Sequence, residues 1–325
     1  MRVLIVRLSA LGDVVQSLGA VQALAAARPE WELVWVVQRE FVPVLACAGM
    51  PLQLVPHARR PALAGLLRTS AALRAHRCDV ALDLQGNWKS ALVARLSGAE
   101  RVLGAAAASR QAAASAMLAT QRIACSRHPA RMAQALVREL VPGLPESPPR
   151  LVAPASELAR ETAEVRALGV DPTRPFRVFV VTDPRDPRAW WPSAMVREER
   201  AAPLPALWLY GPGEAHLAAP AGVRVLRHAG GELARLVALG TMLAQAGGVA
   251  LGPDRGATHG LCASGARTLV LYGPQDPEST APLQAQVVRR REPPPCMPCR
   301  SRVCRWRQGP VCMDFSPALE SSGTG

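Results

Sequence analysis

The stretch VLIVRLSALGDVVQSLGAV, residues 3–21, contains the local pattern that decides the fold. Its first four residues form an apolar run with the length and the β-branched character of a buried strand. Gly12 and Asp13 follow in a short turn, and an alanine-rich helix is predicted from there to about Ala27. A buried strand, a short glycine-containing loop and a helix are the repeating unit of a parallel α/β sheet.

The same alternation recurs along the chain and predicts parallel strands covered by helices on both faces. In the first half, a strand over 33–37 precedes a helix over 42–48, and a strand over 80–84 precedes a helix from residue 89. In the second half, strands are predicted over 178–181, 206–210, 223–226, 248–251 and 268–272. The predicted fold is therefore α/β, with a doubly wound sheet in each half.

Chain length and one proline-rich segment predict two domains. A chain of 325 residues is too long for one ordinary core and suits two. Residues 141–154, VPGLPESPPRLVAP, hold too many prolines to continue a helix and are predicted to form a linker. The domains are thus expected over 1–150 and 151–325, and an irregular, cysteine-rich extension is expected from about residue 292.

Composition excludes several classes of protein. With 49% hydrophobic and 19% charged residues, the chain has the make-up of a globular protein. No apolar stretch approaches the roughly 20 residues that cross a bilayer. Arg7 and Asp13 interrupt any apolar region that a secretory signal would need, so a cytoplasmic protein is expected. In a reducing compartment, eight cysteines favour free thiols or metal ligands over a disulfide framework.

The formal charge of +13 predicts attraction to anionic partners, which include nucleic acid, phosphorylated substrates and an anionic membrane surface. Aromatic residues make up only 4% of the chain and no recognition motif is present, so no nucleic acid is expected as a partner. Lys89 is the only lysine, and the abundance of arginine and alanine resembles a genome-wide bias, which weakens any argument from total charge.

Two loops of the first half are candidate sites, because open parallel sheets bind ligands beyond the carboxyl ends of their strands. In the first loop, residues 7–13, a glycine and the free N–H groups of a helix start favour an anion. Asp13 is there either a helix cap or a catalytic carboxylate. The second loop, residues 83–90, is either a well-capped turn or a site in which Lys89 supplies a compact ammonium rather than a planar guanidinium.

In the second half, LGPDRGATHG, residues 251–260, joins a strand to an apolar helix. A glycine-containing loop with an arginine and a histidine can cradle a diphosphate, although His259 alone is also typical of a structural histidine. Neither a G-x-G-x-x-G motif after the first strand nor a P-loop lysine motif is present, so a standard dinucleotide or P-loop site is not supported.

Five motifs together resemble the lipopolysaccharide heptosyltransferase family, glycosyltransferase family 9. Its members are inverting enzymes that move heptose from ADP-heptose to the inner core of lipopolysaccharide. The resemblance covers most of the chain and rests on the order and spacing of RLSALGDVVQSLGAV (7–21), CDVALDLQGNWKSALVARLSG (78–98), Trp191-Pro192, LGPDRGATHG (251–260) and LYGPQDP (271–277).

The resemblance implies the GT-B architecture, in which two Rossmann-like domains face a central cleft. It implies an acceptor site on the first domain, where Asp13 takes the proton from the acceptor hydroxyl. It also implies a nucleotide-sugar site on the second domain, with no metal required for catalysis, and a lipid-linked or glycan acceptor at the anionic inner membrane surface. The predicted acceptor-side residues are Gly12, Gln85 and Lys89. On the donor side the resemblance implies Asp254, Gly256 and His259, and Arg188 and Arg255 are predicted beside them as sources of positive charge.

Three positions depart from the family pattern. The lysine usual two residues before the Trp-Pro pair is Ala189, the hydroxyl residue usual in the phosphate loop is Arg255, and the proline usual in the first helix is Gly19. Arginine can replace the missing charge but not the geometry of lysine. The alternative to an active transferase is therefore a diverged relative that binds a nucleotide sugar or a partner without turnover.

The extension contains four cysteines whose first pair has the spacing of metal ligands: Cys296, Cys299, Cys304 and Cys312. Four thiolates can close a tetrahedral zinc site. Free thiols and an occasional disulfide are the alternatives.

Overall fold

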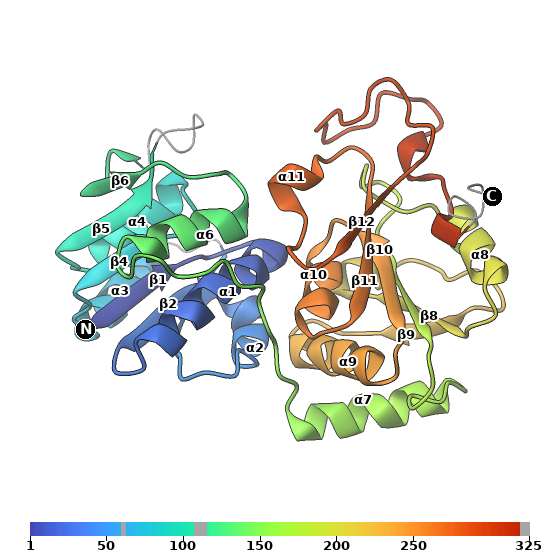
Figure 1. Cartoon of the computed structure of the whole chain (residues 1–325), viewed down its shortest axis with the longest axis horizontal. Coiled ribbons are helices and arrows are strands. Elements are labelled where there is room, and N and C mark those ends of the chain that lie inside the picture. Colours follow the sequence, from blue (N-terminus) through green and yellow to red (C-terminus); the bar gives the residue numbers. More distant parts are fainter. Residues whose placement is uncertain (60–62, 107–115, 319–325) are drawn as a thin grey trace. The chain divides into compact units, whose positions relative to one another are not determined.

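The computed structural model describes residues 1–59, 63–106 and 116–318, and the chain separates into two compact units at residue 150 (Figure 1). Unit 1 is residues 1–150 and unit 2 is residues 151–325. The predicted cysteine-rich extension is described as far as residue 318, and its last seven residues lie outside the described residues. No helix in the described part of the chain has the length and the apolar character needed to cross a membrane.

In unit 1, the described residues form a six-stranded parallel sheet in the order β3-β2-β1-β4-β5-β6. Helices cover both of its faces, with α1 against α6 and α3 against α4 (Figure 1). The strands are β1 (Arg2–Val6), β2 (Glu32–Gln38), β3 (Gln53–His57), β4 (Val80–Asp83), β5 (Arg101–Ala105) and β6 (Gln121–Ile123), and the helices are α1 (Leu11–Ala27), α2 (Val42–Leu45), α3 (Leu63–Ala75), α4 (Trp88–Leu96) and α6 (Pro129–Arg138).

The apolar run of β1 is continuous because both faces of this central strand are buried. Residues 3–6 are fully excluded from solvent. Leu4 and Val6 pack in one cluster with Leu73 of α3 and Val93 of α4. In a strand that is covered on both faces, apolar residues do not alternate with polar ones. This is why the continuous apolar run predicts a buried strand.

In unit 2, the described residues form a second six-stranded parallel sheet, in the order β12-β11-β10-β7-β8-β9. One core lies under α7, α9 and α10, and another lies under α8 and the end of the extension. The strands are β7 (Arg177–Val180), β8 (Ala206–Tyr210), β9 (Arg224–Arg227), β10 (Val249–Pro253), β11 (Arg267–Tyr272) and β12 (Gln286–Arg289), and the helices are α7 (Ala155–Ala167), α8 (Pro192–Ala201), α9 (Leu233–Gln245), α10 (Gly256–Ala263) and α11 (Pro277–Thr280).

Both sheets have the same doubly wound order, and this confirms the predicted α/β fold class. Counted from the first strand of each unit, the order is 3-2-1-4-5-6, the Rossmann arrangement. The order reverses between β1 and β4 in unit 1 and between β7 and β10 in unit 2. Sheets of this kind bind ligands beyond the carboxyl ends of the two strands at the reversal, so each unit has one defined place for a site.

Gly19 lies where α1 meets the predicted linker. A Cβ atom at this position would lie 2.1 Å from the carbonyl oxygen of Ser147 and 2.9 Å from the backbone nitrogen of Pro149. Backbone atoms cannot yield as a flexible side chain does. The glycine that departs from the family pattern thus permits close contact between the helix and residues 147–149.

Gly19→Ala is therefore expected to lower the free energy of unfolding of unit 1. Overpacking costs about 1–3 kcal/mol, which exceeds the roughly 1 kcal/mol that alanine gains over glycine in helix propensity. Urea unfolding followed by circular dichroism measures the change. Gly230→Ala is the control, because a Cβ atom there meets nothing within 4 Å. A Gly19→Ala protein as stable as the parent would contradict the packing argument.

Candidate active site

In unit 1, two loops meet at the reversal of the sheet. One follows β1 and the other follows β4. The Gln85 side-chain oxygen accepts hydrogen bonds from the backbone N–H groups of Leu8 at 2.7 Å and Ser9 at 3.2 Å. Gln85, predicted on the acceptor side, thus fixes the position of the first loop.

Arg7 holds Asp13 in place. Arg7 is buried, and its guanidinium donates to the carbonyl oxygen of Leu84 and pairs with Asp13, with Nη2 and Oδ2 2.5 Å apart. The Asp13 side chain is 37% exposed, so its carboxylate remains accessible. Helix α1 begins at Leu11 with Ala10 as its N-cap. The interpretation of Asp13 as a helix cap is therefore wrong.

The turn after β4 is strongly capped. Asp83 is buried, and its Oδ1 accepts hydrogen bonds from the N–H groups of Gln85 at 3.1 Å and Gly86 at 3.0 Å. Burial raises the pKa of Asp83, while its hydrogen bonds oppose that rise. Asn87 accepts from the N–H groups of Lys89 and Ser90 and caps α4. The capped turn predicted as one alternative is present, and it places Lys89 in the first turn of α4.

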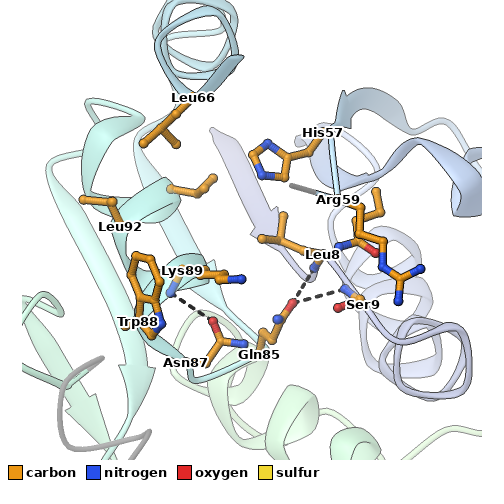
Figure 2. A pocket seen from close by; sticks show the side chains of 12 residues that line it. Leu8, Ser9, His57, Arg59, Leu66, Gln85, Asn87, Trp88, Lys89 and Leu92 are labelled. Carbon is orange, nitrogen blue, oxygen red and sulfur yellow. Dashed lines mark hydrogen bonds between the residues drawn. The ribbon is translucent and has the colours of Figure 1, made fainter. Parts of the chain in front are cut away.

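A cavity of about 660 Å³ lies beside these two loops (Figure 2). Its two cationic groups, Lys89 and Arg59, lie on opposite sides of it, and the Lys89 ammonium is 5.7 Å from the centre of the Trp88 ring. Burial lowers the pKa of His57, so its ring is neutral at pH 7. The lining residues are Leu8, Ser9, Gln38, His57, Arg59, Leu66, Gln85, Asn87, Trp88, Lys89, Leu92 and Val93.

In unit 2, Asp254 and His259 form a buried pair at the carboxyl end of β10. His259 Nε2 lies 2.8 Å from Asp254 Oδ1, and the hydroxyl of Thr280 donates to Asp254 Oδ2 at 2.9 Å. Burial alone would raise the pKa of Asp254, but the bonds from His259 and Thr280 hold it below its usual value. Gly256 is the first residue of α10, and no side chain caps the N-terminus of this helix. Its N–H groups are thus suited to an anion.

Arg188 and Arg255 share one counterion, Asp186. The Asp186 carboxylate lies 2.8 Å from Arg188 Nη2 and 2.6 Å from Arg255 Nη1. Arg188 also donates to the carbonyl oxygen of Asp254 at 3.1 Å, and Arg255 lies 3.6 Å from Glu214. These contacts join the loop after β7 to the loop after β10 at the second reversal. The two arginines predicted to face the donor therefore already have two carboxylate partners.

The structure places the predicted residues in two groups. Gly12, Asp13, Gln85 and Lys89 lie at the carboxyl edge of the first sheet, and Arg188, Asp254, Arg255, Gly256 and His259 lie at the carboxyl edge of the second. Ala189 is buried, and its backbone N–H donates to the carbonyl oxygen of Asp186 at 2.9 Å. The contacts of Arg7 and Asp186, and the place of Arg59 in the cavity lining, were not predicted from the sequence. For Arg7 a signal exists, because a charged residue directly follows the apolar run of β1.

The four thiols of the extension are free and differ in burial. Cys299 is exposed, Cys296 and Cys304 are half-buried, and Cys312 is buried. Among the described residues, no three His, Cys, Asp or Glu side chains are grouped so that they hold a metal ion. As placed, the thiols do not fit a zinc site, and the zinc site remains a prediction.

The thiols are expected to react unequally with iodoacetamide. Burial, reinforced by the other three cysteines of the extension, raises the pKa of Cys312 to about 11. At pH 8 its thiolate fraction is then roughly a hundredfold below that of an unperturbed thiol. Mass spectrometry of timed alkylation should find Cys299 modified far faster than Cys312. Protection of all four cysteines that a chelator abolishes would instead support a metal site.

Comparison with known proteins identifies relatives of this architecture. The family model for glycosyltransferase family 9 (heptosyltransferase) matches residues 66–308. No curated protein sequence matches the chain.

Three solved structures share its fold. A glycosyltransferase of family 9 from Veillonella parvula has a TM-score of 0.74 at 17% identity, covering 88% of this chain and 84% of its own. The ADP-heptose lipopolysaccharide heptosyltransferase II of E. coli has a TM-score of 0.70 at 18% identity, covering 89% and 91%. The E. coli heptosyltransferase WaaC, solved with ADP-2-deoxy-2-fluoro heptose, has a TM-score of 0.67 at 20% identity, covering 89% and 93%.

Proposed function

Because the chain belongs to glycosyltransferase family 9, the heptosyltransferase family, we propose that it is an inverting glycosyltransferase for lipopolysaccharide core or a similar glycan. The donor in this proposal is ADP-heptose or another nucleotide-diphosphate sugar, by analogy with the ligand of WaaC. The observation that carries the proposal is the accessible Asp13 carboxylate, which pairs with Arg7 at the end of the loop whose Leu8 and Ser9 line the cavity of unit 1.

The proposed reaction is a single displacement with Asp13 as the base. The acceptor hydroxyl oxygen forms a bond to the anomeric carbon as the bond from that carbon to the diphosphate oxygen breaks. The hydroxyl proton passes to Asp13, since it becomes acidic only as the new bond forms. Arg7 occupies one carboxylate oxygen of Asp13 and orients the other.

The departing diphosphate needs compensation for its negative charge. In unit 2, the candidates are the uncapped N-terminus of α10 and the guanidinium groups of Arg188 and Arg255. Preorganised donors of this kind are effective because they do not reorganise during the reaction. To bind the diphosphate, the two arginines either release Asp186 or contact Asp186 and the diphosphate at the same time.

The cavity of unit 1 suits an acceptor that carries both a sugar and an anionic group. Lys89 and Arg59 supply two positive charges, while Leu66, Leu92 and Trp88 supply apolar surface. Lys89→Gln is expected to raise the KM for the acceptor more than it lowers kcat, since this lysine binds rather than reacts.

A second candidate function is binding of a nucleotide sugar without turnover. The pairing of Arg188 and Arg255 with Asp186 favours it, because these cations are already neutralised within the protein. Ala189, in the position where the family places a lysine, supplies no cation.

A donor screen by thermal shift, followed by a transfer assay, separates the two candidates. ADP and ADP-heptose are expected to raise the Tm in both. ADP release in the presence of a Kdo-lipid A acceptor, or slow hydrolysis of the donor, identifies the transferase. Binding without either reaction supports the second candidate. No shift with any nucleotide-diphosphate sugar, together with no transfer, overturns both.

A further inference from the structure

The extension of unit 2 presents a loop whose two ends are anchored. We define this tail loop as residues 300–309. At its start, the N–H group of Arg300 donates to the carbonyl oxygen of Pro274 at 2.7 Å, and its guanidinium pairs with Asp276 at 2.5 Å. Beyond its end, Met313 and Phe315 are buried in a core of unit 2, and Trp190 donates to the carbonyl oxygen of Phe315 at 2.8 Å. The loop is therefore held at its base.

Between these anchors the tail loop exposes cationic and apolar side chains side by side. Arg302, Arg305 and Arg307 are exposed, and the loop has no acidic residue to neutralise them. Val303 is 74% exposed and Trp306 is 45% exposed. The Trp306 indole N–H donates to Cys296 Sγ at 3.4 Å, and its ring remains partly exposed. An apolar patch rimmed by cationic side chains is typical of an interaction site.

We propose that the tail loop docks on an anionic phospholipid surface. Tryptophan belongs at the boundary between headgroups and acyl chains, where its ring is buried and its N–H group stays polar. Arginine side chains extend toward the anionic headgroups while their stems cover apolar surface. Val303 and Trp306 enter the boundary, and Arg302, Arg305 and Arg307 contact the headgroups around them.

The inference rests on the proposed function in one respect, because a lipid-linked acceptor lies in such a surface. It adds which part of the chain makes the contact. Single-stranded nucleic acid fits the tail loop less well, since stacking platforms present several aromatic rings and this loop has one.

Co-sedimentation of the full chain with vesicles tests the proposal. The protein is expected to bind phosphatidylcholine vesicles that contain phosphatidylglycerol, and to bind pure phosphatidylcholine weakly. The triple variant Arg302→Gln/Arg305→Gln/Arg307→Gln is expected to lose about a hundredfold in partitioning. Val303→Ser/Trp306→Ser should also bind more weakly than the parent. Because the lost contacts are apolar, the ratio of the two affinities should not depend on the salt concentration. The charge-matched control Arg174→Gln/Arg224→Gln/Arg267→Gln, which changes exposed arginines elsewhere, should partition like the parent.

Equal partitioning of the tail-loop triple variant and the charge-matched control would overturn the proposal, as would equal binding to both kinds of vesicle. Tight binding of single-stranded RNA that the triple variant loses, without vesicle binding by the parent, would also overturn it and assign the loop to nucleic acid. The vesicle assay contains no donor sugar. Vesicle binding without sugar transfer would therefore defeat the proposed function alone, and transfer to a lipid-free acceptor without vesicle binding would defeat this inference alone.

Discussion

Asp13→Asn is expected to lower kcat for sugar transfer by about 10²- to 10⁴-fold, the range that a positioned general base contributes. Asparagine has nearly the same shape as aspartate but cannot take the acceptor proton. The rate of ADP release with a saturating acceptor measures the loss. Because Asp13 belongs to unit 1 and the donor-binding candidates belong to unit 2, the thermal shift with ADP should stay the same.

Two controls separate a lost base from a damaged fold. Asp13 is the partner of the buried Arg7, so the asparagine variant must first be shown to keep its circular dichroism spectrum and its Tm within a few degrees. Glu30→Gln removes an exposed carboxylate just beyond α1 and should alter neither turnover nor stability. Parental turnover in a folded Asp13→Asn protein would exclude Asp13 as the base.

The sequence predicts the central strands of both sheets well, and physical reasons explain the strands that it missed. Strands β1, β4, β7 and β10 lie inside the sheets, so both of their faces are buried and their sequences are mainly apolar. The missed strands β3, β6 and β12 lie at sheet edges. Strand β3 contains Pro56, which an edge strand tolerates because it forms hydrogen bonds with a neighbour on one side only. Strand β12 is largely exposed and therefore lacks an apolar run. The fourth missed strand, β5, begins with the exposed Arg101 and contains Gly104, which interrupts its apolar run.

The candidate site was predictable only as a set of loops. Strand ends identify the loops, and the resemblance to a family identifies Asp13, but neither indicates which side chains meet. The pairing of Arg255 with Asp186 spans 69 residues, and no local pattern encodes it. The same holds for Gln85, which was predicted on the acceptor side. Its side-chain oxygen accepts hydrogen bonds from backbone N–H groups that lie 77 and 76 residues earlier in the chain.

The two units hold the loops at their strand reversals in similar ways. At each reversal of strand order, side chains tie together the two loops that meet there. In unit 1, Gln85 binds the loop after β1, and in unit 2, Arg188 binds the backbone of the loop after β10. The proposed transfer has two substrates, and two sheets of the same order provide one candidate site each.

Helix α7, the first helix of unit 2, is attached to its core through a buried ionic network. Glu161 is completely buried and lies 2.8 Å from His228 Nε2 and 2.7 Å from Arg235 Nε. Arg235, itself 3% exposed, also pairs with Glu164 and with Glu232. These ion pairs compensate for the cost of burying the charged groups. Removing Arg235 takes the guanidinium away from the buried Glu161 and leaves His228 as its remaining ionic partner.

Arg235→Met is therefore expected to lower the free energy of unfolding of unit 2 by about 3–5 kcal/mol, the cost of breaking a buried ion pair. Methionine fills much of the space of the arginine stem, so the loss is mainly that of the charge. Urea unfolding followed by circular dichroism measures it. Arg200→Met, at an exposed position of α8, is the control and should stay within about 0.5 kcal/mol of the parent.

A double variant distinguishes this electrostatic cause from a packing defect. Arg235→Met/Glu161→Leu leaves no unpaired carboxylate at position 161 and should recover part of the lost stability, because replacing both partners by apolar groups is often close to neutral. A deficit that remains in the double variant would assign the loss to packing.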